Sequence, residues 1–416
     1  EKEGSFYTIK QLWSPVQIMN TSVDKQFDGK FSVENRYDYL NLNTCRFLWK
    51  QVKFPTATDA SNTTAQVLKQ GETQGSDVAA HSAGVLNIKT TILPDADALF
   101  LTAIDRYGHE LWRWTFPVNK LNQANEVLSP LSNKVTSTET ENELTVKAKN
   151  HTFIFSKKDG QLKGVSVNNR KISFANGPRF IGARRADRSL DQFYNHDDEK
   201  AKEKDRTYSE FPDAAVFTKL DVKEDGGNLI VTADYKLGNL DKVQWTINPN
   251  GEAVLDYTYN FSGVVDLMGI CFDYPEDQVI SKRWLGAGPY RVWQNRIHGT
   301  QYDVWENDYN DPIPGETFTY PEFKGYFGSV SWMNIRTKEG TISLTNETPD
   351  AYIGVYQPRD GRDRLLYTLP ESGISVLNVI PPVRNKVNST DLCGPSSQPK
   401  WVNGPQSGRI IFRFME

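Results

Sequence analysis

Apolar and polar residues alternate with a period of two along most of this chain, and this pattern restricts the fold more than any other feature. The alternation is clearest in ELTVKAKNHTFIFSK (143–157), NLIVTADYKL (228–237) and GRIIFRFM (408–415). Successive side chains of a β-strand point to opposite faces of a sheet, so this period is typical of strands with one buried face. Helical periodicity is nearly absent, and DDEKAKEKD (197–205) is too charged for more than a solvated turn or a short surface helix. The sequence therefore predicts an all-β protein.

Two segments also carry the signature of a hairpin. KVQWTINPNGEAVLDYTYNF (242–261) breaks its alternation at Asn-Pro-Asn-Gly, and FSKKDGQLKGVSV (155–167) breaks it at Asp-Gly. These residues favour tight turns between antiparallel strands. Both segments are therefore predicted to form β-hairpins.

The polar, turn-rich stretch from 118 to 142 predicts a domain boundary, because it has no sustained apolar pattern. A chain of 416 residues is also too long to fold around one ordinary hydrophobic core, so two or three domains are expected. Short strand-like runs before the boundary predict an immunoglobulin-like β-sandwich at 20–120. Within it, the hydrophilic segment 58–82 is expected to be a long exposed loop. The strands at 128–416 are expected to form one large β-domain.

Charge, hydropathy and cysteine content exclude several classes of protein. The net charge of −4 and a pI near 5.9 leave no basic surplus to neutralise phosphates, so no nucleic-acid partner is expected. No apolar run approaches the roughly 18 residues of a membrane span, so no membrane partner is expected. Cys45, Cys271 and Cys393 are too few and too far apart for a disulfide scaffold. At most one bridge can form, and buried free thiols are the expectation.

Motifs for metal, cofactor or nucleophile chemistry are missing. No two of the five histidines have the spacing of metal ligands, and DVWENDYND (303–311) lacks the glycine and terminal glutamate of a calcium loop. There is no Gly-x-Ser-x-Gly elbow, P-loop or dinucleotide fingerprint. A glycosidase pair of carboxylates cannot be recognised by spacing, and Asp303 and Glu322 are expected to be exposed loop acids. These patterns therefore predict no metal or cofactor in this chain, and they identify no catalytic residue.

The segment GPYRVWQNR (288–296) instead combines aromatic and planar hydrogen-bonding side chains. The C–H faces of a pyranose ring pack on aromatic rings, and its hydroxyls suit Arg, Asn and Gln side chains, so the segment has the composition of a sugar-binding wall. The alternative is that Trp284 and Trp293 anchor a core while the arginines extend over them.

A longer stretch, RWLGAGPYRVWQNR (283–296), resembles the Trp-x-Gly-x-Gly-Pro-x-Glu-x-Tyr-x-Asp-Arg motif in the last domain of family 2 glycoside hydrolases, the β-galactosidase group. Trp284, Gly286, Gly288, Pro289 and Arg296 match this motif. Arg291, Trp293 and Asn295 replace its Glu, Tyr and Asp. These three changes put galactose specificity in question, and Arg291 suggests an anionic sugar, because guanidinium matches carboxylate and sulfate.

Four further segments resemble the same family in the same order, so the resemblance covers almost the whole chain. They are GSFYTIKQLWSPVQI (4–18), FSVENRYDYLNLNTCRFLWKQ (31–51), the opening of a large domain at 153–180, and its closing strands at 394–414. The resemblance implies that an immunoglobulin-like domain precedes a supersandwich of the galactose-mutarotase type at 128–416. It also implies that residues 1–19 leave a catalytic TIM barrel that carries both catalytic glutamates. The chain begins EKEGSFYTIK, with neither an initiator Met nor a signal-peptide core, and is expected to be a mature product or a piece of a larger protein.

The resemblance further implies that this chain supports the barrel and lines one side of a carbohydrate site. The expected partners are therefore carbohydrate and the catalytic barrel of the same polypeptide, and export from a bacterial cell is expected. The candidate sugar-binding residues are Tyr290, Arg291, Trp293, Asn295, Arg296, Gln398 and Trp401.

Three alternatives stay open. The chain could be a stand-alone carbohydrate-binding or scaffold protein, or the supersandwich region of a polysaccharide lyase, although an immunoglobulin-like module argues against the lyase. A free-standing mutarotase would need a histidine and a glutamate as base and acid around one sugar, and none of the five histidines has a convincing setting.

Overall fold

A computed structural model describes residues 4–59, 64–118, 134–185, 208–211, 213–308, 325–348, 350–355, 372–382 and 394–416. Antiparallel strands dominate these residues, which confirms the predicted all-β class. The residues divide into two compact units. The first comprises Glu1–Gln123, Leu285–Tyr290 and Ile297–Trp305, and the second comprises Ala124–Trp284, Arg291–Arg296 and Glu306–Glu416. Much of the predicted boundary at 118–142 lies outside the described residues, and the domain limits at 19, 120 and 128 stay predictions.

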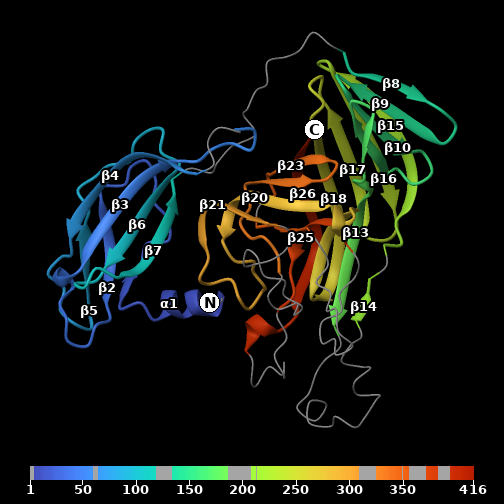
Figure 1. The fold of residues 1–416 in the computed structure, drawn as a ribbon. Coiled ribbons are helices and arrows are strands. Elements are labelled where there is room, and N and C mark those ends of the chain that lie inside the picture. Colours follow the sequence, from blue (N-terminus) through green and yellow to red (C-terminus); the bar gives the residue numbers. More distant parts are fainter. Residues whose placement is uncertain are drawn as a thin grey trace, which may run out of the picture. The chain divides into compact units, whose positions relative to one another are not determined.

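The first unit contains a β-sandwich of two antiparallel sheets, with strand orders β1-β2-β5 and β4-β3-β6-β7 (blue to cyan in Figure 1). This arrangement is an immunoglobulin-like sandwich, as predicted. Its elements are α1 (Gly4–Leu12), β1 (Val16–Ile18), β2 (Lys30–Asn35), η1 (Leu42–Thr44), β3 (Arg46–Lys53), β4 (Gln66–Gln74), β5 (Ser82–Asn87), β6 (Ala98–Ile104) and β7 (Glu110–Pro117).

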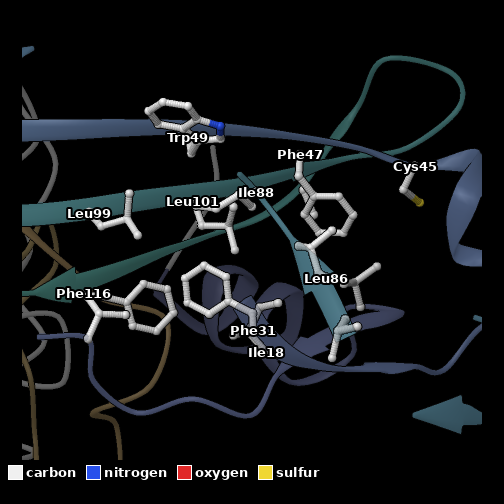
Figure 2. Packing of buried hydrophobic residues seen from close by; sticks show 14 of the residues in the cluster. Ile18, Phe31, Cys45, Phe47, Trp49, Leu86, Ile88, Leu99, Leu101 and Phe116 are labelled. Atoms are coloured by element: carbon white, nitrogen blue, oxygen red, sulfur yellow. The ribbon is translucent and has the colours of Figure 1, made fainter. Parts of the chain in front are cut away.

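Alternating side chains of the two sheets fill the core of this sandwich. Figure 2 shows Phe31 of β2, Leu101 of β6 and Phe116 of β7 turned toward one another, and the rings of Phe31 and Phe116 lie 5.0 Å apart. Asn35 is also fully buried, and its Nδ2 donates to the carbonyls of Leu40, Val78 and Ala79. A buried amide is tolerated because its hydrogen bonds are made, and here it holds the loops at one end of the sandwich.

One expectation for this unit is wrong. The segment 58–82 is not a long loop, because β4 occupies its middle and pairs with β3 along its length. Most β4 side chains are exposed, so the strand lacks the alternation that would have indicated it. It is held by backbone hydrogen bonds and by close contact of Gly71 with the Trp49 ring, which a side chain at position 71 would prevent. Helical structure is also present at α1, which sequence periodicity did not predict.

The second unit is a large antiparallel supersandwich of two sheets (Figure 1). A ten-stranded sheet has the order β24-β25-β19-β13-β11-β10-β9-β8, with β12 on β11 and β14 on β13, and a nine-stranded sheet has the order β15-β16-β17-β18-β26-β23-β22-β20-β21. Residues 285–288 of β20 and 301–305 of β21 are grouped with the first unit. The elements up to β18 are β8 (Thr136–Glu139), β9 (Glu143–Ala148), β10 (His151–Ser156), β11 (Leu162–Val167), β12 (Arg170–Ile172), β13 (Ala175–Arg185), β14 (Tyr208–Glu210), β15 (Val216–Asp225), β16 (Asn228–Lys236), β17 (Leu240–Ile247) and β18 (Ala253–Val265). The elements that follow are β19 (Leu267–Asp273), η3 (Glu276–Gln278), β20 (Val279–Gly288), β21 (Gln301–Asp308), β22 (Trp332–Thr337), β23 (Gly340–Asn346), β24 (Tyr352–Gly354), β25 (Ile374–Val379), η5 (Pro395–Ser397) and β26 (Lys400–Met415).

Both predicted hairpins are present. β17 pairs with β18 around the Asn-Pro-Asn-Gly turn, where Gly251 has a φ of 87° and its N–H donates to the carbonyl of Asn248. β10 pairs with β11 around Asp159-Gly160, and Gly160 has a φ of 73°. Glycine is favoured at these two positions because left-handed backbone is costly for other residues. The charged segment 197–205 lies outside the described residues.

An aromatic cluster fills the space between the two sheets. Phe174 stacks on Phe272 at 4.5 Å and contacts Phe412 of β26 at 5.1 Å, and Trp245 of β17 is 1% exposed. Cys45 and Cys271 are buried free thiols, as expected, and Cys393 lies outside the described residues. Within the described ranges, no helix is both long and apolar enough to cross a membrane.

Candidate functional site

The sequence-predicted sugar segment follows β20, which ends at the cis peptide Gly288–Pro289. Trp284, within β20, is fully buried, and its ring meets Phe327 edge to face at 4.9 Å. Tyr290 belongs to the first unit, where its ring lies 4.8 Å from that of Tyr7 in α1. The next six residues, 291–296, belong to the second unit.

Arg291 and Trp293 are buried side chains of the second unit. Arg291 is 7% exposed, and its guanidinium lies over the Phe327 ring at 5.1 Å, a cation–π contact. Trp293 is 1% exposed and meets Tyr326 edge to face at 5.6 Å. The two residues therefore anchor their segment in the protein, which agrees with the alternative weighed for Trp293 above. Whether either also contacts a sugar stays a prediction.

The backbone of this segment is tied to a second strand-like stretch. Val292 exchanges two backbone hydrogen bonds with Tyr326, of 2.8 and 2.9 Å. Gly325 lies so close to Val292 and to the Trp293 indole that a Cβ there would collide with both. The close approach fixes where the chain emerges from the core after Trp293.

Residues 293–296 then form a tight turn. The N–H of Arg296 donates to the carbonyl of Trp293 at 2.8 Å, and Asn295 and Arg296 are half-buried and exposed, respectively. The turn therefore presents Asn295 and Arg296 toward the surface while Trp293 stays in the core.

Gln294 joins this turn to the segment that precedes β26. It is 8% exposed, and its Nε2 donates to the carbonyls of Ser396 at 3.1 Å and Gln398 at 2.7 Å. Asn295 Nδ2 also donates to Ser397 Oγ at 3.2 Å. Because buried hydrogen bonds to carbonyls are directional, Gln294 fixes the register between 293–296 and 396–398.

Trp401 lies three residues beyond Gln398, at the start of β26, opposite Val264 of β18. It is 71% exposed. An indole this open has a ring face available for stacking, and the polar side chains of the 293–296 turn belong to the same unit.

The structure thus connects two groups of candidates that are far apart in the sequence. Asn295 and Arg296 lie on a turn that is hydrogen-bonded to the Ser396–Gln398 stretch, and Trp401 lies three residues after that stretch. Sequence reasoning missed Gln294, the residue that makes the connection. It lies within the GPYRVWQNR segment, but nothing in that pattern showed that its amide faces inward.

The structure describes one of the two acids that were expected to be exposed in loops. Asp303 is not a loop acid but lies in β21, where its Oδ2 is 3.0 Å from Arg113 Nη2 within the first unit. Burial raises the pKa of the Asp303 carboxyl above its ordinary value, although Arg113 opposes this effect. Glu322 and residues 309–311 lie outside the described residues. Among the residues that are described, no three His, Cys, Asp or Glu side chains are grouped so that they could hold a metal ion.

Comparison with known proteins gives one family. Residues 147–379 match the family described as beta galactosidase small chain. No curated protein matches the chain. Among solved structures, galactose 1-epimerase from Lactobacillus acidophilus NCFM matches with a TM-score of 0.35 and 10% identity, over 68% of this chain and 99% of that protein. A Salmonella typhimurium protein assigned as a mutarotase matches with a TM-score of 0.33 and 9% identity, over 68% of this chain and 94% of that protein.

Proposed function

Because the chain belongs to the beta galactosidase small chain family, we propose that it is the non-catalytic C-terminal part of a family 2 glycoside hydrolase. In this proposal the bond-breaking carboxylates lie on a catalytic barrel of the same polypeptide. The second unit supports that barrel and lines one side of its sugar site. The family favours this function over the supersandwich region of a polysaccharide lyase and over a stand-alone binding protein.

The proposed wall contains residues that contact the sugar and buried residues that support them. Trp401, Gln398, Asn295 and Arg296 face the sugar, with the indole stacking on a pyranose face and the polar groups binding hydroxyls. Arg291 and Trp293 hold the wall in position from within the core. Their burial, at 7% and 1% exposure, fits a supporting role.

The observation that carries the proposal is the pair of hydrogen bonds from Gln294 to the Ser396 and Gln398 carbonyls. They connect a core-anchored turn to the stretch that leads into an exposed tryptophan. A binding wall needs this rigidity, because groups that are already fixed lose less entropy when ligand binds.

An exposed apolar face on α1 supports a partner for the first unit. Phe6, Ile9 and Leu12, spaced three apart, are exposed, and Trp13 at the helix end is 80% exposed. The helix is held to its own unit by the Lys10–Glu110 ion pair at 2.8 Å. Several exposed apolar side chains on one short helix are typical of a contact with another protein surface. We propose that the catalytic barrel covers it, and that the whole enzyme is exported.

Trp401→Ala in the enzyme that carries both barrel and chain tests this function. On the nitrophenyl glycoside that the enzyme hydrolyses best, KM is expected to rise about tenfold with a smaller change in kcat, because a stacking ring contributes binding to ground and transition states alike. Leu237→Ala is the matched control, since Leu237 is 74% exposed in the same unit and has no part in the wall. An unchanged KM for Trp401→Ala would refute the proposed wall.

A further inference from the structure

A cavity of about 400 Å³ in the second unit shares no lining residue with the candidate sugar wall. Its lining comes from both sheets of the supersandwich, with Phe180 from β13 on one side and Phe217 and Tyr235 from β15 and β16 on the other. Tyr235 continues the inward row of β16 after Val231 and Ala233, so the cavity lies at the end of the space between the sheets. We propose that this cavity binds a neutral saccharide, independently of the wall around Trp401.

Aromatic rings form the apolar part of the cavity. Phe217 and Tyr235 are register partners and meet edge to face at 5.9 Å. Phe180 packs on Tyr259 at 5.3 Å and on Phe261 at 6.0 Å. These rings are therefore fixed by their neighbours, and rigid rings are the surfaces on which the C–H faces of a sugar pack.

The β10–β11 turn forms a second, preorganised wall. Ser156 Oγ accepts from the N–H groups of Lys158 and Asp159 at 3.1 and 3.3 Å, and Tyr235 Oη donates to the Asp159 carbonyl at 2.9 Å. Gly160 packs so closely against Tyr235 and Phe217 that a Cβ there would lie 2.8 Å from each. The turn is thus held to the aromatic wall, and the cavity does not depend on a ligand for its shape.

Polar groups with unused hydrogen-bonding capacity surround the rings. Asp213 Oδ1 accepts from the backbone N–H groups of Ala215, Asn239 and Leu240. Among the described residues, no hydrogen bond or ion pair is made by Asp213 Oδ2, by the Lys158 ammonium or by Gln161 Nε2. The cavity therefore offers one strong acceptor and two donors, and hydroxyl groups of a sugar can use both kinds.

The charges of the lining side chains favour a neutral ligand over an anionic one. The lining contains two basic side chains, Lys158 and Arg179, and two acidic ones, Asp159 and Asp213. Outside the lining, Arg179 is paired with Asp273 at 2.7 Å and Asp159 with Lys163 at 2.8 Å, so the balance stays neutral. A phosphate, sulfate or uronate would meet an acidic side chain without a net positive charge to compensate, whereas a neutral polyol meets no such penalty. The combination of fixed rings, neutral charge and paired donors and acceptors fits a neutral saccharide.

A second cavity, of about 390 Å³, provides the contrast. It lies over β17, β18 and β26, and three of its four charged side chains are paired with each other, since Arg409 binds both Asp256 and Glu347. Its aromatic residue, Tyr257, is 2% exposed and offers no open ring. Gln244, which lines this cavity, is therefore a suitable control position.

Binding of the chain to an array of neutral, uronate-bearing and phosphorylated glycans tests the inference, followed by calorimetric titration with the neutral glycan bound best. We expect Phe217→Ala and the double variant Lys158→Ala/Gln161→Ala each to weaken that binding about tenfold. Trp401→Ala and Gln244→Ala are expected to leave it unchanged. The double variant alters only side chains of the β10–β11 turn, so it decides the result even if Phe217→Ala fails to fold.

Three outcomes overturn the inference. One is the absence of binding to every neutral glycan, and another is binding restricted to acidic glycans. The third is binding that Trp401→Ala abolishes and the double variant does not affect, which would support the proposed wall and refute the cavity. If Trp401→Ala leaves the kinetics of the complete enzyme unchanged while the double variant weakens glycan binding, the proposed wall is refuted and the cavity is supported.

Discussion

Removal of the Gln294 amide should loosen the connection between the 293–296 turn and the stretch before β26. In Gln294→Ala, the carbonyls of Ser396 and Gln398 lose their donors, which lie 3.1 and 2.7 Å away. Each bond contributes about 0.5–1.5 kcal/mol net, so the loss is about 1–3 kcal/mol in total. At about 2–4 °C per kcal/mol for a domain of this size class, the melting temperature of the second unit should fall by about 5 °C.

Differential scanning calorimetry of the chain measures this change. Gln294→Glu should destabilise at least as much, because it keeps the shape of the side chain but turns a donor into an acceptor facing two carbonyls. The matched control is Gln406→Ala in β26, since Gln406 forms no side-chain hydrogen bond with the described residues. If Gln294→Ala and Gln294→Glu have the same melting temperature as the control variant, Gln294 does not hold the two segments together.

Three further predictions concern the same unit. Trp293→Ala should lower the free energy of unfolding by about 3–5 kcal/mol, as measured by urea denaturation, because it empties a site that is 1% exposed; a loss below 1 kcal/mol, as for a surface residue, would contradict its anchoring role. Arg291→Ala should lower the melting temperature but leave the kcat/KM ratio of uronate to neutral glycosides unchanged in the full enzyme; a selective loss on uronates would show direct contact with an acidic sugar. Burial acts to raise the pKa of Asp273, but hydrogen bonds led by the one from Arg179 outweigh it and hold the pKa below the ordinary 3.8. The unfolded chain then binds more protons in acid, so stability should fall as the pH drops below about 4, and Asp273→Asn should flatten this part of a melting-temperature profile; an equally steep profile would exclude the pair as a cause.

The strands that carry the fold could be predicted where one face is buried. The alternation of apolar and polar residues in 228–237 and 242–261 predicted β16, β17 and β18. It is present because every second side chain of these strands is buried in the core between the two sheets. β4 escaped prediction for the same physical reason, since an edge strand with few buried side chains has no alternation to detect.

The helix α1 was missed for a different reason. It has only nine residues, which is too short for a helical period to be distinguished, and Thr8 and Ile9 are β-branched residues that favour strands. Its apolar side chains are also exposed within the described structure, so they do not reflect packing inside this chain.

The sequence indicated where the candidate site lies, but it could not show which of its residues are buried supports and which are exposed. The motif at 283–296 drew attention to Arg291 and Trp293, yet spacing cannot distinguish an aromatic ring in a core from one on a surface. The burial of Trp293 and the exposure of Trp401 follow from tertiary packing. Gln294 could not be recognised because its partners lie about a hundred residues later and are backbone carbonyls, which carry no sequence signal.

In the proposed function, bond cleavage requires residues outside this chain. The most direct test compares hydrolysis of a nitrophenyl glycoside panel by the isolated chain and by the enzyme that carries the barrel as well. Turnover is expected from the complete enzyme, and none above background is expected from the chain alone. Hydrolysis by the isolated chain at a rate comparable to that of the complete enzyme would contradict the proposed function.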